Sequence, residues 1–454
     1  MFRNPRRSWI LFRFTIATFI LCLAVLGSAQ FRTGPVQVLV TPDHADWKYA
    51  PGESAVFSVK ALKNGNPLAA AGASWAVGPE LLPPIRTGSI DLSADGAATV
   101  NAGTRRDAGF LRFVVTVADE GRSYRGMCTV GFAPEQIRPV VQDPEGFDSF
   151  WQEGKDALAK IPIAEQRTPY PEKSTATLDA YQVSFQNVAG PSNRGASRIY
   201  GILTEPKAPG KYPALLRLPG AGVYGVSGIV KEALEDTIVL SIGIHGIPLT
   251  LDASVYNSIS RGAIDTYYIY NIESRDMYYY RRVYLGCVRA VDYLAALPNW
   301  DGKTLAVIGS SQGGALAIVT AALHPRVGAL ASIHPALSDS GGYVQDGRAG
   351  GWPPELFQDP ANRTKERLDN FAFYDVVNFA RRVKVPGIYS WGYNDETCPP
   401  VSTYSSYNVI TAPKVLTLQL ETGHWIAPEQ NARIMRWVGE YLKTGITPFT
   451  LIAP

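Results

Sequence analysis

Cysteine, methionine and histidine are scarce in this chain of 454 residues, which has four, four and five of them respectively. Cys22 lies in an apolar segment near the N-terminus, and the other cysteines stand far apart at positions 128, 287 and 398. Three widely spaced cysteines provide neither a disulfide framework nor the paired spacing of a zinc site. We therefore expect all three to be small buried side chains that pack in a core.

The chain also lacks a block of basic residues. Its formal net charge is +3, from 43 Lys and Arg against 40 Asp and Glu. Four of those arginines fall within the first 30 residues, which contain no acid, so the remainder has 39 basic and 40 acidic residues and a net charge of −1. This excludes the electrostatic footprint of a protein that binds nucleic acid. With 46% hydrophobic and 18% charged residues, the composition is that of a globular protein and not of a disordered one.

No apolar run is long enough to suggest a membrane span. The longest near the N-terminus, residues 14–26, would cover about 20 Å as a helix, against about 30 Å of bilayer hydrocarbon. Basic residues precede it and small residues follow it, which is the layout of a secretory signal peptide. We predict a signal over residues 1–29, cleaved after Ala29, and a secreted or periplasmic product without a stable membrane anchor. An uncleaved N-terminal anchor is the alternative.

Residues 34–133 have the pattern of a small all-β region. Apolar and polar residues alternate in short stretches that are separated by turn sequences such as Asn64-Gly65. The predicted strands are 36–40, 54–62, 89–92, 97–101, 110–118 and 124–130. We expect an immunoglobulin-like sandwich. It contains no cluster of histidines, cysteines and carboxylates, so we expect it to position its neighbour, with carbohydrate contact as the alternative.

After a linker at 134–146, residues 147–454 change to alternating helices and buried strands. Helices are predicted at 147–161, 281–296, 312–323 and 430–442. Apolar strand-like runs are found at 213–218, 237–244, 304–308, 327–333, 385–391 and 415–420. This alternation predicts a doubly wound, mostly parallel sheet of the α/β-hydrolase type.

One short motif in this part is typical of a nucleophile. The residues Gly309-Ser310-Ser311-Gln312-Gly313 link an apolar strand to an alanine-rich helix, as in the nucleophile elbow of hydrolases, where small residues let the backbones cross. The pattern alone is weak, but its position between a strand and a helix strengthens it. We predict that Ser311 is a nucleophile, with a purely structural tight turn as the alternative.

A serine hydroxyl needs a base to accept its proton, and in α/β-hydrolases the base follows the nucleophile in the chain. Three histidines do so. His424 lies in a loop directly after the last apolar strand, where a base is expected. His324 is at the C-terminal end of the helix after the elbow, and His334 precedes any suitable acid. We predict His424 as the base, with His334 as the alternative.

The base must itself be oriented by an acid. Asp395 lies just after the predicted strand at 385–391, and catalytic groups in open α/β sheets collect at the carboxyl ends of strands. We predict Asp395 as the acid, with Glu396 as its nearest rival and a capping or turn residue as the structural alternative.

Ester hydrolysis also needs N–H donors for the oxyanion. One is the backbone N–H of Gln312, the residue after the nucleophile. The second is expected in the loop Pro219-Gly220-Ala221-Gly222. We predict Ala221 there, with Gly220 as the alternative, and we expect no metal and no cofactor.

Several longer segments support a family assignment. They are FDSFWQEGKDALAKIP from residue 147, RIYGILTEPKAPGKYPALLRLPGAG from 198, MYYYRRVYLGCVRAVDYLAALPNWDG from 277, GSSQGG from 309, DETCPP from 395, TYSSYN from 403 and GHW from 423. In these segments the chain resembles the acetyl xylan esterase and cephalosporin C deacetylase family, carbohydrate esterase family 7, from residue 143 onward. The resemblance implies the triad Ser311, Asp395 and His424, oxyanion donors at Ala221 and Gln312, removal of acetyl groups from sugars, and often oligomers.

The chain departs from that family in three places. Residues 219–221 read Pro-Gly-Ala where many members have His-Gly-Tyr. Residues 244–248 read Ile-His-Gly-Ile-Pro where an Arg-Gly motif is usual, and we expect His245 to be a hydrogen-bonded loop residue. The N-terminal sandwich is additional to the short family members.

The sequence therefore predicts a secreted serine esterase that removes acetyl groups from acetylated carbohydrates, xylan or xylo-oligosaccharides, through an acyl-enzyme. An acetylated sugar is the expected partner, nucleic acid is not, and an oligomer is compatible with the pattern. Two alternatives stay open. One is an exported peptidase of the prolyl oligopeptidase type, and the other is a non-catalytic carbohydrate-binding protein with a retired hydrolase domain.

Overall fold

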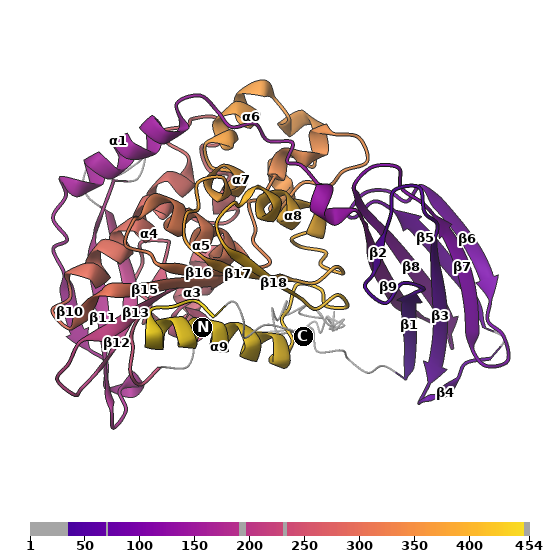
Figure 1. The fold of residues 1–454 in the computed structure, drawn as a ribbon, viewed down its shortest axis with the longest axis horizontal. Coiled ribbons are helices and arrows are strands. Elements are labelled where there is room, and N and C mark those ends of the chain that lie inside the picture. The colour runs from indigo at the N-terminus through magenta and orange to yellow at the C-terminus, as the bar shows by residue number, and fades with distance from the viewer. Residues whose placement is uncertain (1–34, 70, 190–196, 230–233, 449–454) are drawn as a thin grey trace, which may run out of the picture. The chain divides into compact units, whose positions relative to one another are not determined.

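A computed structural model describes residues 35–69, 71–189, 197–229 and 234–448 (Figure 1). The predicted signal peptide at 1–29, with Cys22, lies outside the described residues. Among the residues that are described, none of the helices combines the length and hydrophobicity that a membrane crossing requires.

The first part of the described chain folds into two packed β-sheets. A four-stranded sheet contains β1 (Val36–Pro42), β3 (Ala55–Lys63), β4 (Asn66–Pro67) and β7 (Ala97–Gly103). A five-stranded sheet has the order β2 (Lys48–Tyr49), β9 (Arg122–Phe132), β8 (Gly109–Asp119), β5 (Gly72–Gly78) and β6 (Arg86–Asp91). Phe57 of β3 stacks on Phe113 of β8 with ring centroids 4.8 Å apart, and both are buried. The inner faces of the two sheets therefore share one apolar core, as in the predicted sandwich.

A nine-stranded mixed sheet forms the centre of the second part. Its order is β10 (Gln166–Pro169), β11 (Leu178–Asn187), β12 (Ser197–Pro206), β14 (Ile238–Gly243), β13 (Tyr212–Leu218), β15 (Trp300–Ser310), β16 (Ala329–Ile333), β17 (Gly387–Trp391) and β18 (Lys414–Leu418). The first three strands pair antiparallel with their neighbours, and the six from β14 to β18 are parallel. This confirms the predicted α/β class.

Helices cover both faces of this sheet (Figure 1). They are α1 (Phe147–Ala159), α2 (Val226–Ile229), α3 (Ala253–Ser260), α4 (Tyr279–Ala296), α5 (Gln312–Leu323), α6 (Lys365–Ala372), α7 (Val376–Ala380), α8 (Pro400–Val409) and α9 (Pro428–Thr444). Single 3₁₀ turns occur at 134–136, 171–173, 267–269, 340–344, 354–356 and 360–362. Helix α9 packs on one face, where its apolar residues join a cluster with β13, β15 and β16. Helices α4 and α5 pack on the other face.

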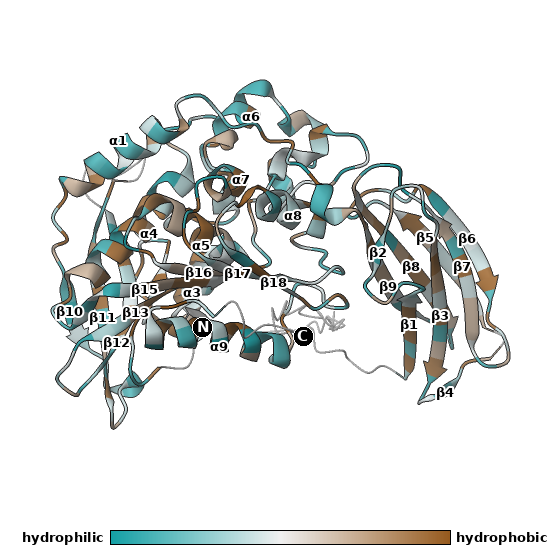
Figure 2. Cartoon of the chain, in the orientation of Figure 1, coloured by the Kyte–Doolittle hydropathy of each residue, from teal (hydrophilic) through white to brown (hydrophobic). Residues whose placement is uncertain are grey.

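The sequences of these helices explain their positions. Helix α5 is apolar on almost every side, and its residues are buried, as expected for a helix enclosed in a core (Figure 2). Helix α9 has one apolar stripe, formed by Ile434, Trp437, Val438 and Tyr441, which faces the sheet. It ends at Gly445, whose φ of 72° is the left-handed conformation that closes many helices.

The order of the central strands creates a switch point in the sheet. Strands β13 and β15 are neighbours in the sheet. The connection after β13 leads to β14 on one side, and the connection after β15 leads to β16 on the other side. In open α/β sheets the crevice at such a point, beyond the carboxyl ends of the strands, is where ligands bind. The elbow after β15 and the loop after β13 meet at this crevice.

Candidate active site

Ser311 follows β15 on a sharp turn and begins helix α5. Its φ and ψ are 59° and −123°, a conformation that non-glycine residues rarely adopt. The turn brings backbones so close that a Cβ atom on Gly309 would lie 2.2 Å from the Gly313 carbonyl, and one on Gly313 would lie 2.3 Å from the Leu218 carbonyl oxygen. Gly309 is therefore required by the turn of the elbow itself, and Gly313 by the crossing of the elbow with β13.

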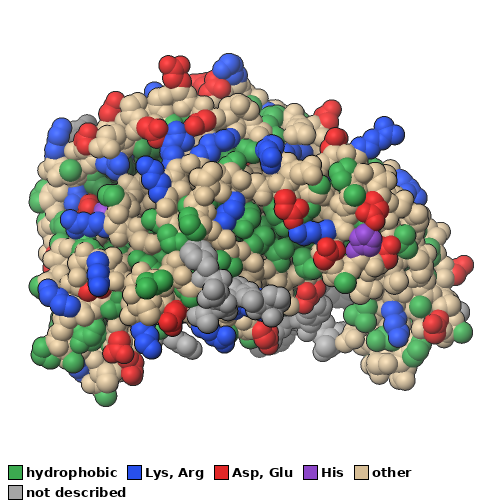
Figure 3. Space-filling view, in the orientation of Figure 1, with side chains coloured by type: hydrophobic (Ala, Val, Ile, Leu, Met, Phe, Trp, Pro, Cys, Tyr) green, Lys and Arg blue, Asp and Glu red, His purple; other side chains and the backbone are tan. Residues whose placement is uncertain are grey.

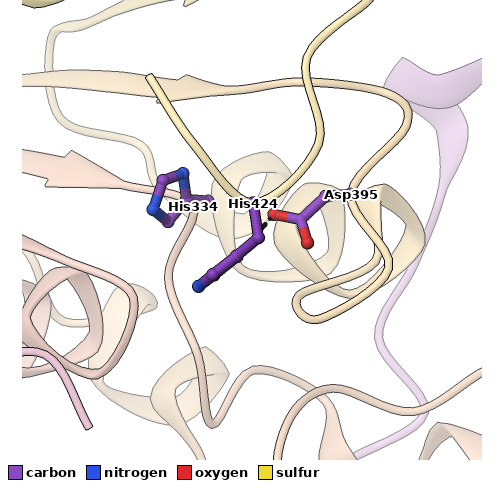
Figure 4. A group of neighbouring side chains, drawn as sticks. All are labelled: His334, Asp395 and His424. Atoms are coloured by element: carbon purple, nitrogen blue, oxygen red, sulfur yellow. Dashed lines mark hydrogen bonds and ion pairs between the residues drawn. The ribbon is translucent and has the colours of Figure 1, made fainter. Parts of the chain in front are cut away.

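His424 connects Ser311 to Asp395. Its Nε2 lies 3.0 Å from Ser311 Oγ, and its Nδ1 lies 2.8 Å from Asp395 Oδ2. The three residues come from loops after β15, β17 and β18, which run parallel and end at the same edge of the sheet. Figure 4 shows the His424 ring directed toward the Asp395 carboxylate. The His424 side chain is 25% exposed to solvent, so the site is open to solvent at this residue.

Asp395 is fully buried, and its second oxygen is also bonded. Oδ1 accepts the backbone N–H groups of Thr397 at 2.8 Å and Cys398 at 2.9 Å. Burial alone would raise the pKa of Asp395, but its hydrogen bond and charge interaction with His424 and the backbone N–H donors outweigh burial and lower the pKa below its usual value. Asp395 therefore carries the negative charge that can orient and stabilise an imidazolium.

The rival residues have other partners. His334 Nε2 is 2.7 Å from Ser310 Oγ, and its ring packs against that of His424 with centroids 4.2 Å apart. Burial lowers the pKa of His334 to about 3, so it stays neutral. His324 contacts Asp292 at 3.1 Å, and Glu396 forms two hydrogen bonds with Arg125.

The same side chains contain the atoms that could bind a metal ion. His334, Asp395 and His424 offer ligand atoms within 4.8 Å of one another (Figure 4). The Nε2 of His334 already contacts a serine, and both nitrogens of His424 contact other members of the site. A cation would have to break the bond between Asp395 and His424, so the arrangement fits proton transfer better than coordination.

The loop after β13 is fixed through its carbonyl oxygens. Gln312 Nε2 donates to the Gly220 oxygen at 3.1 Å, and the Tyr224 hydroxyl donates to the oxygens of Gly220 at 2.8 Å and Ala221 at 3.0 Å. His245 Nε2 lies 2.8 Å from the Gly222 oxygen, which agrees with its prediction as a hydrogen-bonded loop residue. These bonds hold the loop beside the N-terminus of α5, where the N–H of Gln312 has no acceptor inside its own helix.

The Gln312 side chain has a role that sequence reasoning missed. Its Oε1 accepts the hydroxyls of Tyr267 and Tyr280, each at 2.6 Å. Both tyrosines are buried, and burial raises the pKa of each above its usual value. No local spacing could link these tyrosines to Gln312, because they are 45 and 32 residues away from it in the sequence.

The remaining cysteines agree with their prediction. Cys128, Cys287 and Cys398 are buried and unpaired. Burial raises the pKa of Cys398 well above its usual value, so this thiol, although close to Asp395 in the chain, is protonated and not a nucleophile.

Comparison with known proteins gives consistent matches. The family model of acetyl xylan esterase (AXE1) matches residues 135–441. The acetyl esterase Axe7A of Xylanibacter ruminicola is 38% identical over 440 residues, which cover 94% of this chain and 96% of that protein. At 94% coverage the similarity must extend over most of the β-sandwich as well.

Two solved structures share the fold of the second part. The acetyl xylan esterase from Paenibacillus sp. R4 aligns with a TM-score of 0.57 and 24% identity, covering 68% of this chain and 98% of that one. Acetyl xylan esterase 1 from Thermoanaerobacterium sp. JW/SL YS485 aligns with a TM-score of 0.55 and 22% identity, covering 68% and 97%. Both are thus matched nearly completely by two thirds of this chain.

Proposed function

The chain belongs to the acetyl xylan esterase family and is a carboxylic ester hydrolase, and from this we propose that it removes acetyl groups from acetylated carbohydrates, xylan or xylo-oligosaccharides, with Ser311, His424 and Asp395 as its triad. The observation that carries the proposal is His424, which lies within hydrogen-bond distance of the serine and the aspartate at the same time. A nucleophile, a base and an orienting acid in this order are the arrangement that acyl transfer requires.

The proposed reaction has two halves. Ser311 Oγ attacks the acetyl carbonyl while His424 Nε2 accepts its proton, and Asp395 stabilises the imidazolium. The backbone N–H groups of Ala221 and Gln312 hold the oxyanion of the tetrahedral intermediate. His424 then protonates the departing sugar oxygen, which leaves an acetyl ester on Ser311. Water attacks this ester with His424 again as the base, and acetate is released as Ser311 regains its proton.

We also propose export and a division of the chain. Residues 1–29 would act as a signal peptide cleaved after Ala29, giving a secreted or periplasmic enzyme. Residues 34–133 would form the β-sandwich domain, 134–146 the linker and 147–454 the catalytic domain. An acetylated sugar as the substrate is supported by the match to the acetyl xylan esterase family and by the similarity to Axe7A, an acetyl esterase.

Acetate release from acetylated xylo-oligosaccharides tests the proposal. The protein from Gln30 onward should release acetate, and Ser311→Ala should lower kcat by roughly four orders of magnitude or more because no acyl-enzyme can form. Ser310→Ala, which removes the neighbouring hydroxyl, should keep most of the activity.

Two outcomes would contradict the proposal. Full acetate release by Ser311→Ala would remove the serine from the mechanism. If the wild-type protein released no acetate from xylo-oligosaccharides and did not hydrolyse p-nitrophenyl acetate either, the esterase function would be wrong and the carbohydrate-binding hypothesis would take its place.

A further inference from the structure

An arginine from the β-sandwich reaches the loop that carries Asp395. Arg112 lies on β8, and its side chain is only 6% exposed. Its Nη2 donates to the backbone oxygen of Asp395 at 2.8 Å and to that of Tyr393 at 3.5 Å. Its Nε donates to Thr129 Oγ1 at 2.8 Å, which anchors the guanidinium to β9 of its own sheet.

A second arginine and an aromatic contact hold the same loop. Arg125 on β9 forms two hydrogen bonds with Glu396, at 3.0 and 2.8 Å, and Arg112 Nη1 lies 3.7 Å from the same carboxylate. Phe110 on β8 meets the ring of Tyr393 edge-on, with centroids 4.9 Å apart. The sandwich therefore contacts the loop at Tyr393, Asp395 and Glu396, directly around the acid.

The energetics favour a specific role for Arg112. Burial lowers the pKa of its guanidinium, and the charges of Glu80, Glu396 and Asp395 oppose that effect. A buried cation is costly unless its donors are bonded. Because the carbonyl oxygens of the loop are the acceptors of Nη2, a shift of the loop would leave this donor unbonded, and the guanidinium therefore favours one position of the loop. Nη2 binds both carbonyl oxygens of the loop while Nε binds Thr129, two attachments that the single ammonium group of a lysine cannot make equally well.

We propose that Arg112 is a positioning residue for the acid of the triad: by binding the backbone of Asp395 and Tyr393, it fixes the carboxylate at the distance that His424 needs. This inference rests on the proposed catalytic role of Asp395. It gives the β-sandwich an indirect part in the reaction, because an arginine of the sandwich holds the loop that carries the acid.

A double-mutant cycle with p-nitrophenyl acetate tests the proposal. Arg112→Gln should lower kcat roughly 10- to 100-fold, the effect of a displacement of about 1 Å in a catalytic group, with little change in KM. Arg112→Lys should recover part of the loss. In an Asp395→Asn background, Arg112→Gln should cause no further loss, because the carboxylate through which Arg112 acts is already gone.

Controls separate positioning from folding. Arg122→Gln changes an exposed arginine on the same hairpin and should leave kcat unchanged. All variants are assayed below the temperature at which any of them begins to unfold, as followed by circular dichroism. If Arg112→Gln does not fold, Arg112→Lys takes its place in the cycle, with a smaller expected loss.

The outcomes distinguish this inference from the proposed function. If Asp395→Asn is inactive but Arg112→Gln and Arg112→Lys have wild-type kcat, only the positioning role is wrong. If the loss caused by the Arg112 substitution is the same in both backgrounds, Arg112 acts through the general structure and the positioning role is again wrong. If Asp395→Asn has wild-type kcat, the proposed acid itself is wrong.

Discussion

At the scale of single residues, Gln312 joins two requirements of the site. Its backbone N–H is the proposed oxyanion donor, and its side chain donates to Gly220 while accepting the hydroxyls of Tyr267 and Tyr280. The amide is buried, so loss of the side chain would take this acceptor from both tyrosine hydroxyls, while the Gly220 oxygen would keep the Tyr224 hydroxyl. One residue thus links the turn after β15, the loop after β13 and two buried tyrosines.

Replacing this amide should therefore reduce stability as well as activity. Gln312→Leu leaves two buried hydroxyls without an acceptor, and we expect the free energy of unfolding to fall by roughly 2–4 kcal/mol. Urea unfolding followed by tryptophan fluorescence measures the change. Adding Tyr267→Phe and Tyr280→Phe to Gln312→Leu removes the unpaired hydroxyls and should restore part of the stability. A Gln312→Leu protein as stable as wild type would show that these bonds contribute little.

At the scale of elements, the crossing of the elbow with β13 is a tight steric constraint on the site. Gly313→Ala places a methyl group against the backbone oxygen of Leu218, and neither backbone can move without displacing Ser311. We expect a loss of roughly 3 kcal/mol or more and little soluble protein. Gly439→Ala is the matched control, because Gly439 lies on the exposed side of α9 with no atom within 4 Å of the new Cβ. It should stabilise by about 0.5–1 kcal/mol. Equal thermal midpoints for the two variants would contradict this account.

The parallel strands could be predicted from the sequence, and the antiparallel edge could not. Strands β14, β16 and β17 are buried on both faces, and their sequences are continuous apolar runs. Strands β11 and β12 mix polar and apolar residues without a clean alternation, and β5 is rich in glycine and alanine, so local propensity gave no signal for these three.

The candidate site also contains residues that the sequence could indicate and one that it could not. Chain order and placement after strands pointed to Ser311, Asp395 and His424, and the structure brings these three side chains together; their roles stay predictions. The contact of Arg112 with the Asp395 backbone spans 283 residues of sequence. Such a contact depends on how the sandwich packs against the loop after β17, and no local sequence motif could predict it.

At the scale of the whole molecule, the charged residues are distributed differently on the surface and inside. On the face drawn in Figure 3, acidic and basic side chains are interspersed. Between the sandwich and the α/β part, by contrast, Arg112 and Glu80 are buried together, and Glu80 accepts the backbone N–H of Val401 on α8 at 3.4 Å. Ionisable groups at this interface couple its stability to pH.

Glu80 gives the clearest prediction of that coupling. Its side chain is 2% exposed, and burial raises the pKa of Glu80 from 4.5 to about 7, even though Arg112 and Arg105 oppose the shift. Between these two pH values the folded protein keeps a proton that the unfolded chain has released. The free energy of unfolding therefore falls as pH rises through this window, by roughly 3 kcal/mol at 1.36 kcal/mol per unit of pKa, and the loss is complete above pH 7.

Glu80→Gln removes this titration and keeps an acceptor for Val401. Relative to wild type, the variant should therefore become more stable by roughly 3 kcal/mol between pH 4.5 and pH 8. Urea unfolding of both proteins at pH 4.5, 6, 7 and 8 measures the difference, and comparison with wild type cancels every other titrating group. Glu120→Gln, an exposed carboxylate that pairs with Lys63, should give a nearly constant difference over the same range. A constant difference for Glu80→Gln as well would mean that Glu80 is ionised in the folded protein, held so by the arginines around it.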